Sequence, residues 1–217
     1  MNKPLMMMTL PSSGSTWLAD VIVRELGLLA HQKSAEFFQP LTNLPLYAPL
    51  SRCFGSENPS CMSNIMTMPH RDDFEFAVAQ FHKHGYTFCK EVYQFFHTPM
   101  FAQHFNVFFL YRSAEHTFPP KRLRVLAWYD AIATAIETQI GNQFTKTNLL
   151  ARSIEAHRWC WEYLIQGYAD SYGLPILNYE TIASGTEAEA TAELAKVFSG
   201  EDLQKVVRGV MASRKPR

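Results

Sequence analysis

The chain has 217 residues, with 20 basic and 20 acidic side chains and therefore a formal net charge of zero. Hydrophobic residues make up 47% and aromatic residues 13%, enough to bury a sizeable core, which argues against a disordered chain. The balanced charge argues against a general binder of nucleic acid or of anionic membranes, so any anion site must be local. No apolar run approaches the roughly 20 residues that a membrane-spanning helix needs.

The cysteine and histidine patterns give no sign of a metal centre or of a disulfide framework. The four cysteines contain no Cys-x-x-Cys pair, and the eight histidines contain no His-Glu-x-x-His motif. Cys53 and Cys61 could close a loop, but four cysteines in a chain of this length do not make a disulfide-stabilised fold. The sequence therefore predicts reduced thiols, a cytoplasmic protein and no bound metal.

The first elements in chain order are a short buried strand and a helix, joined by a loop of small residues. Residues 4–10 are apolar and predict the strand. Residues 16–29 carry apolar side chains at the spacing of one helix face. A strand, a small-residue loop and a helix are typical of the start of an α/β nucleotide-binding unit.

The rest of the chain alternates between predicted strands and helices. Residues 30–75 lack a regular pattern, and a segment of that length is often functional. Apolar runs and periodicity then predict strands at 86–92, 105–111 and 174–178, and helices at 121–139, 150–172, 186–198 and after Ser199. This alternation predicts one α/β domain over residues 1–217, with a central parallel sheet in three α/β/α layers and an irregular insertion at about 30–85.

The loop that follows the first strand has the residue types of a phosphate-binding turn. Backbone N–H groups in such a loop, together with the positive end of the helix dipole, can surround an anion. Gly14 lets the backbone approach the anion closely, and the hydroxyls of Ser15 and Thr16 can donate to it or cap the helix. An ordinary strand-to-helix turn with a Ser/Thr cap is the alternative. The Gly-Lys pair of a Walker A loop is absent, which disfavours an ordinary P-loop NTPase.

Three segments resemble, in the same order, the cofactor-binding elements of the sulfotransferases that use 3′-phosphoadenosine 5′-phosphosulfate (PAPS). Residues 11–17 (PSSGSTW) are similar to the family's loop around the 5′-phosphosulfate, whose Trp lies near the adenine. Residues 108–113 (FFLYRS) are similar to the strand that ends in the Arg that binds the 3′-phosphate. Residues 175–180 (PILNYE) are similar to the strand whose Tyr lies near the nucleotide.

The resemblance covers about residues 4–182 and implies a P-loop NTPase-like α/β/α fold. It also implies a set of cofactor-binding residues: Ser12, Ser13, Gly14, Ser15, Thr16, Trp17, Arg112 and Tyr179. An Arg at the carboxyl end of a strand is suited to the separate 3′-phosphate, because its guanidinium binds phosphate through two parallel hydrogen bonds. A surface salt bridge is the alternative role for Arg112.

The implied reaction is transfer of a sulfuryl group from PAPS to an acceptor hydroxyl or amine, leaving 3′,5′-adenosine bisphosphate (PAP) and requiring no metal. The acceptor would be a small molecule, a glycan or a peptide, on the side of the irregular insertion. By chain order, Glu91 is the predicted base and Lys90 the electrostatic partner of the transferred group. An exposed ion pair is the alternative for these two, and His70 and His97 are reserve bases. The oligomeric state stays open.

Two positions depart from the family pattern. Ser12 stands where the family's loop usually has Lys, and Pro120 stands where it usually has a Ser that contacts the 3′-phosphate. These departures keep a second function open, a non-catalytic nucleotide- or acceptor-binding protein on the same fold. An ATP-dependent phosphoryl-transfer enzyme is a third possibility.

Overall fold

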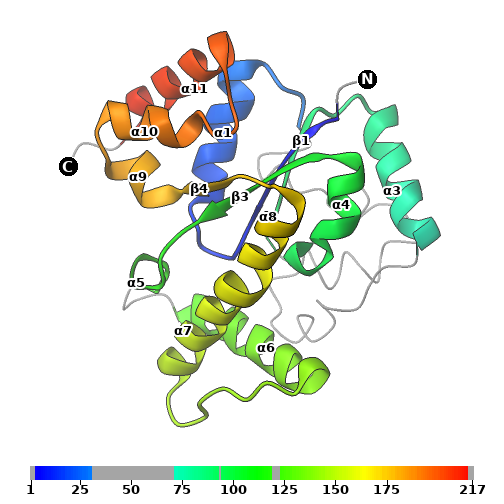
Figure 1. The fold of residues 1–217 in the computed structure, drawn as a ribbon, viewed down its shortest axis with the longest axis vertical. Helices are drawn as coiled ribbons and strands as arrows, with labels where there is room; N and C mark the ends of the chain where they lie inside the picture. Colours follow the sequence, from blue (N-terminus) through cyan, green and yellow to red (C-terminus); the bar gives the residue numbers. More distant parts are fainter. Residues whose placement is uncertain (1–2, 31–70, 93, 119–122, 215–217) are drawn as a thin grey trace.

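The computed structural model describes residues 3–30, 71–92, 94–118 and 123–214 of the chain (Figure 1). Four parallel strands form one sheet in the order β2–β1–β3–β4. The strands are β1 (Leu5–Thr9), β2 (Phe88–Glu91), β3 (Asn106–Tyr111) and β4 (Ile176–Asn178). Because β1 and β3 are central strands with both faces covered, their sequences are continuous apolar runs, and the predicted parallel sheet is confirmed.

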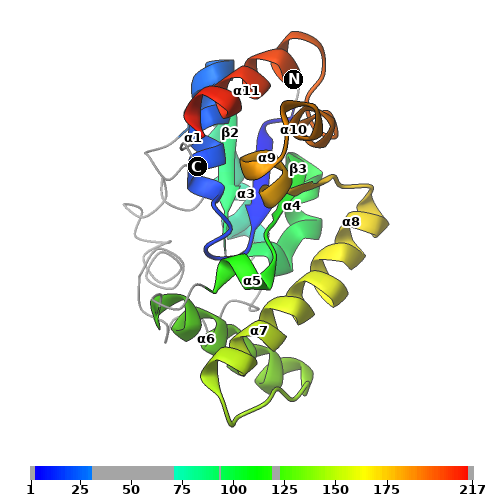
Figure 2. The same cartoon turned by 90° about the vertical axis from the view of Figure 1, so that its left-hand side faces the viewer.

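Helices cover both faces of this sheet. One face carries Met7, Phe88 and Phe108 and packs against a first group of helices: α1 (Ser15–Leu26), α9 (Tyr179–Ser184), α10 (Glu187–Leu194) and α11 (Gly200–Ser213). The other face packs against a second group: α3 (Arg71–Lys83), α4 (Thr98–His104), α6 (Leu123–Ile140), α7 (Leu149–Trp159) and α8 (Gln166–Tyr172). The described part is therefore an α/β structure compatible with the predicted three-layer fold (Figure 2).

The order of the strands places a switch point of the sheet between the ends of β1 and β3. The chain leaves β1 toward α1 on one face, but it leaves β3 toward the short helix α5 (Ala114–Thr117) and α6 on the other face. Parallel sheets bind their ligands at such a point, outside the carboxyl ends of the strands. Figures 1 and 2 show α5, α6 and α7 beyond this end of the sheet.

Several predicted helices and their ends are confirmed. The helix predicted at 121–139 is α6, and the one predicted at 150–172 is a continuous helical run from α7 to α8. This run ends at Gly173, whose φ of 62° gives the left-handed conformation of a helix stop. Thr186 and Glu189 form a capping box at the start of α10, where the helix predicted at 186–198 begins. Ser199 does begin the last helix, but its side chain makes no capping hydrogen bond.

The predicted irregular insertion at about 30–85 is wrong where α3 lies. Phe74, Ala77, Val78 and Phe81 recur at helical spacing and are buried against the sheet, while most of the helix is polar, which weakens its hydrophobic signal. Residues 31–70 lie outside the described residues, and so do Cys53, Cys61 and His70. In the described ranges no helix is both long enough and apolar enough to cross a bilayer.

Candidate functional site

The loop between β1 and α1 contains two residues in the left-handed region of backbone space. Ser12 has a φ of 64° and Gly14 a φ of 82°. Glycine adopts this conformation freely, but for an L-residue such as Ser12 it costs on the order of 1 kcal/mol. Such local strain is concentrated at ligand-binding turns, because the surrounding structure must hold it in place.

The start of α1 offers hydrogen-bond donors that the described residues do not use. Gly14 precedes the helix, and no side chain caps it. Within the described ranges, the amides of Ser13, Gly14 and Ser15 have no acceptor. The Oγ of Ser13 is buried and likewise has no partner among the described residues. These donors, at the positive end of the helix dipole, are suited to an anion.

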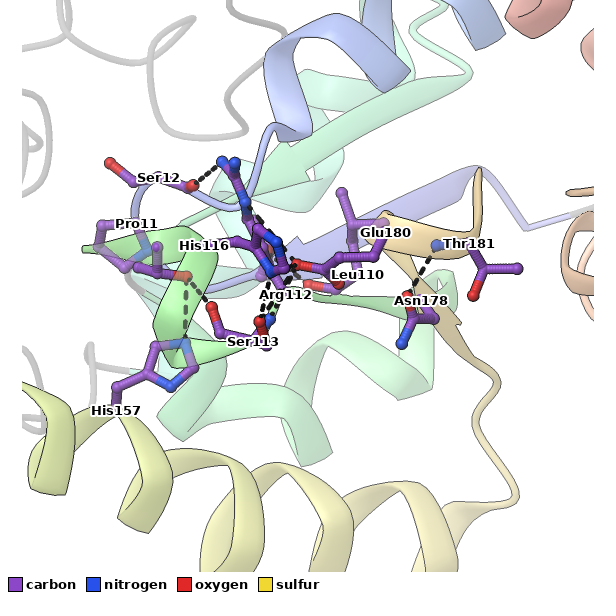
Figure 3. Close-up of polar contacts among 12 residues, drawn as sticks. Pro11, Ser12, Leu110, Arg112, Ser113, His116, His157, Asn178, Glu180 and Thr181 are labelled. Atoms are coloured by element: carbon purple, nitrogen blue, oxygen red, sulfur yellow. Dashed lines mark hydrogen bonds and ion pairs between the residues drawn. The ribbon is translucent and has the colours of Figure 1, made fainter. Parts of the chain in front are cut away.

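Arg112 lies against this loop, directly after β3. Its Nη1 donates to the carbonyl oxygen of Ser12 at 2.8 Å, and its Cζ lies 4.7 Å from the ring centroid of Tyr179. Its Nε is 4.0 Å from Glu180 Oε1. The structure therefore brings together Arg112 and the loop, which are 100 residues apart in the sequence (Figure 3).

Tyr179 occupies the space that a side chain at position 14 would need. A Cβ atom on Gly14 would lie 2.2 Å from Tyr179 Cε2, so both the backbone conformation and this contact require glycine. Trp17 packs edge-on against Tyr179, with 5.9 Å between ring centroids, and its Nε1 donates to Ser213 Oγ at 3.1 Å. Two aromatic rings thus stand beside the loop. Thr16 is exposed and Ser15 is buried at the first turn of the helix.

A polar network that the sequence analysis missed holds the segment after Arg112. Glu180 Oε1 accepts a hydrogen bond from Ser113 N at 3.2 Å and lies 3.3 Å from His116 Nδ1. Ser113 Oγ is 2.8 Å from the same His116 nitrogen. A serine-hydrolase triad needs the serine and the carboxylate on opposite imidazole nitrogens, so this network is not one. Its role here is to connect β3 and β4 beside Arg112 (Figure 3).

Side chains of α5, α6 and α7 make hydrogen bonds to the loop and to the segment after Arg112. Tyr129 OH donates to Pro11 O at 3.1 Å, and Thr117 Oγ1 donates to Ser113 O at 2.8 Å. Thr117 Oγ1 also lies 3.5 Å from Nε2 of His157, which is buried. Burial lowers the pKa of His157 to about 4, so its ring is neutral at pH 7. Periodicity marks Tyr129 as a core residue but does not indicate that its hydroxyl reaches the loop.

Several buried polar atoms beside the loop have no hydrogen-bond partner among the described residues. They are Ser13 Oγ, Arg112 Nε and Glu180 Oε2. An unsatisfied buried polar group costs about 1–3 kcal/mol, so such groups are rare in a finished core. Their position around the loop and Arg112 is what a polar ligand site would require.

The predicted catalytic pair lies at the carboxyl end of β2. Lys90 pairs in register with Met7 and Glu91 with Met8, so the two side chains point to opposite faces of the sheet. Both are buried, with 2% and 3% exposure, so the exposed ion pair considered as the alternative is wrong. The reserve base His97 is also buried. Pro120 lies outside the described residues.

Comparisons with known proteins give no match, so the functional argument depends on the geometry of the site. No family model, no curated protein and no solved structure matches the chain. Within the described residues, no group of three or more His, Cys, Asp or Glu side chains is placed to hold a metal ion.

Proposed function

We propose that this protein binds PAPS and transfers its sulfuryl group to an acceptor hydroxyl or amine, leaving PAP, on a P-loop NTPase-like sulfotransferase fold. One observation carries the proposal: Arg112 Nη1 lies 2.8 Å from Ser12 O, which puts a cation beside the unused donors of the loop. PAPS has a 5′-phosphosulfate and a separate 3′-phosphate, so its recognition needs an anion-binding loop and an independent cation.

In this proposal the two anionic groups of PAPS have separate partners. The amides of residues 12–16 and the hydroxyls of Ser12, Ser13, Ser15 and Thr16 surround the 5′-phosphosulfate. Arg112 binds the 3′-phosphate. A guanidinium has five N–H donors, and the hydrogen bond to Ser12 O uses one of them, so donors remain for phosphate oxygens. Trp17 and Tyr179 contact the adenine, because an aromatic face is suited to stacking on a base.

The chemical step is an in-line displacement at sulfur. The acceptor oxygen or nitrogen bonds to sulfur, while the bond between sulfur and the 5′-phosphate oxygen breaks and its electron pair stays on PAP. Glu91 is the proposed base for the acceptor's proton, and Lys90 the proposed electrostatic partner of the transferred sulfuryl group. Both residues lie at the carboxyl end of β2, beside β1, but their side chains point to opposite faces of the sheet, so this position supports each role separately and not a joint one.

One observation favours a second candidate function, a non-catalytic binding protein. Ser12 replaces the lysine of the family loop, and its left-handed backbone presents its carbonyl to Arg112. The loop itself therefore supplies no cation to assist the leaving group. Such a protein would bind PAP but would not release it from PAPS.

Nucleotide selectivity tests both candidates. We expect titration calorimetry to show that PAP binds at least about tenfold more tightly than adenosine 5′-monophosphate (AMP), because only PAP has a 3′-phosphate. Equal affinities for PAP and AMP would contradict the proposal, and a preference for ATP–Mg²⁺ would point to phosphoryl transfer instead. Release of PAP from PAPS in the presence of phenols, sugars or amines separates the transferase from the non-catalytic protein.

A further inference from the structure

A separate cavity of about 1120 Å³ lies beside the carboxyl ends of β3 and β4. The helical run from α7 to α8 forms one wall, and α5 and α10 close the ends. Tyr111 lines it and directly precedes Arg112, while Asn178 lines it and directly precedes Tyr179. The cavity thus adjoins the proposed nucleotide site, but none of the loop residues 11–16 lines it.

The helical wall is irregular where it faces the cavity. The segment η4 (Cys160–Ile165) is a π-helix between α7 and α8, and its residues Trp161 and Glu162 line the cavity. A π-turn inside an α-helix is rare and is frequently found at functional sites. The irregular turn is therefore an observation independent of the cavity itself.

One buried polar atom in this wall has no partner among the described residues. It is Trp161 Nε1, on a residue that is only 6% exposed. Trp161 packs edge-to-face on Tyr111, with 4.9 Å between ring centroids. The wall therefore combines an aromatic pair with an indole N–H that can donate to a ligand oxygen.

The charged residues of the cavity leave an excess of negative charge. Arg158 Nη2 lies 3.6 Å from Glu115 Oε1 at one end, and Lys196 Nζ lies 2.6 Å from Glu193 Oε1 at the other. Two further carboxylates line the cavity, those of Glu162 and Asp170. Asp170 Oδ1 accepts a hydrogen bond from the side-chain amide of Gln166 at 2.8 Å. Because this amide is neutral, it does not balance the negative charge of Asp170.

Besides burial, two carboxylates that line the cavity, Glu115 and Glu162, contribute to a raised pKa of Tyr111. Burial raises the pKa of its hydroxyl first, and the negative charges of Glu180 and Glu115 raise it further, while the cation Arg158 lowers it. A cationic group placed near Tyr111 would therefore experience a favourable field.

We propose that this cavity is a binding site for a small organic cation: an amine on an aromatic scaffold that also carries an oxygen acceptor. The negative charges of Glu162 and Asp170 attract the ammonium group, and the ring packs against Tyr111 and Trp161. The oxygen accepts a hydrogen bond from Trp161 Nε1. The site does not depend on the proposed nucleotide function.

Three phenols that differ mainly in charge test the proposal: tyramine, p-ethylphenol and p-hydroxyphenylpropanoate. By calorimetry on the full chain without nucleotide, we expect tyramine to bind at least about tenfold more tightly than p-ethylphenol, and the anion to bind most weakly. Equal affinities for the three, or no tyramine binding up to about 10 mM, would overturn the proposal. Because no nucleotide is present, a failure of PAP binding would leave this result unaffected.

A double variant links the binding to the cavity. Glu162→Gln with Asp170→Asn keeps the shape of two exposed side chains and removes their charge, so we expect tyramine affinity to fall about tenfold while p-ethylphenol affinity is unchanged. Glu201→Gln, on the exposed first turn of α11, is the matched control and leaves tyramine affinity unchanged. Unaltered tyramine affinity in the double variant would reject the site, provided that thermal melts show both variants folded.

Discussion

Replacing Arg112 with alanine is expected to weaken PAP binding by at least about tenfold, or 1.4 kcal/mol, and to leave AMP binding nearly unchanged. The reason is that charge-assisted hydrogen bonds from a guanidinium to phosphate are stronger than neutral ones, and only PAP offers a 3′-phosphate. Titration calorimetry of both nucleotides with wild type and variant measures the effect. The ratio of the PAP to AMP affinities is the informative quantity, because any small effect of the lost Ser12 contact on the loop acts equally on both nucleotides and cancels in the ratio.

Two further variants serve as controls for the effect of Arg112→Ala on nucleotide binding. Arg112→Lys keeps the charge but loses the planar fork, so we expect it to recover only part of the PAP preference. Arg24→Ala removes an exposed cation near the far end of α1 and should change neither affinity. If Arg112→Ala and the wild-type protein prefer PAP over AMP equally, Arg112 does not bind the 3′-phosphate.

Arg152→Met is expected to lower the free energy of unfolding by about 3 kcal/mol at neutral pH. Arg152 lies at the start of α7, with its side chain 9% exposed, and reaches three residues of α6. Its Nη1 and Nη2 donate to Glu137 Oε1 and Oε2 at 2.6 and 2.8 Å, and its Nε donates to Asp130 Oδ1 at 2.7 Å. The substitution leaves Glu137 mostly buried without its cation, and this unpaired charge is the main cost.

The decrease in the free energy of unfolding caused by Arg152→Met is expected to depend on pH. The hydrogen bonds from Arg152 lower the pKa of Glu137 to about 2, below its value in the unfolded chain. The pair therefore contributes its full stability above about pH 5 and loses it as the pH falls toward 2. Urea denaturation at pH 7 and pH 3 should show a smaller difference between wild type and Arg152→Met at the lower pH.

A surface pair provides the control for this prediction. Lys205→Met breaks the Lys205–Glu201 pair, in which both side chains are well exposed, and should change the free energy of unfolding far less than Arg152→Met does. A pH-independent difference between wild type and Arg152→Met would show that Glu137 does not carry the effect.

The sequence alone determined the α/β class, the parallel sheet and the positions of its four strands, together with those of α1, α6, the run from α7 to α8, α10 and α11. Apolar runs predicted β1 and β3, and the stripe on α6 and the capping box of α10 were also readable, because these signals are local. The same local signals placed the loop of residues 11–16 and Arg112 directly after two of these strands, and the structure shows that the two strands, β1 and β3, are neighbours. Since parallel strands end at one edge of a sheet, their convergence could be expected before the structure was known.

Only the tertiary structure decided which side chains meet. Ser113 and Glu180 are 67 residues apart, and Tyr129 lies 118 residues from Pro11, whose carbonyl it contacts. Neither contact has a sequence signal, because periodicity reports which face of an element is buried and not what the buried atoms touch. Helix α3 was missed for a related reason: its apolar stripe is narrow within a mostly polar segment. The π-turn at Trp161 and the cavity beside it likewise arise from packing between helices and strands that are distant in the sequence.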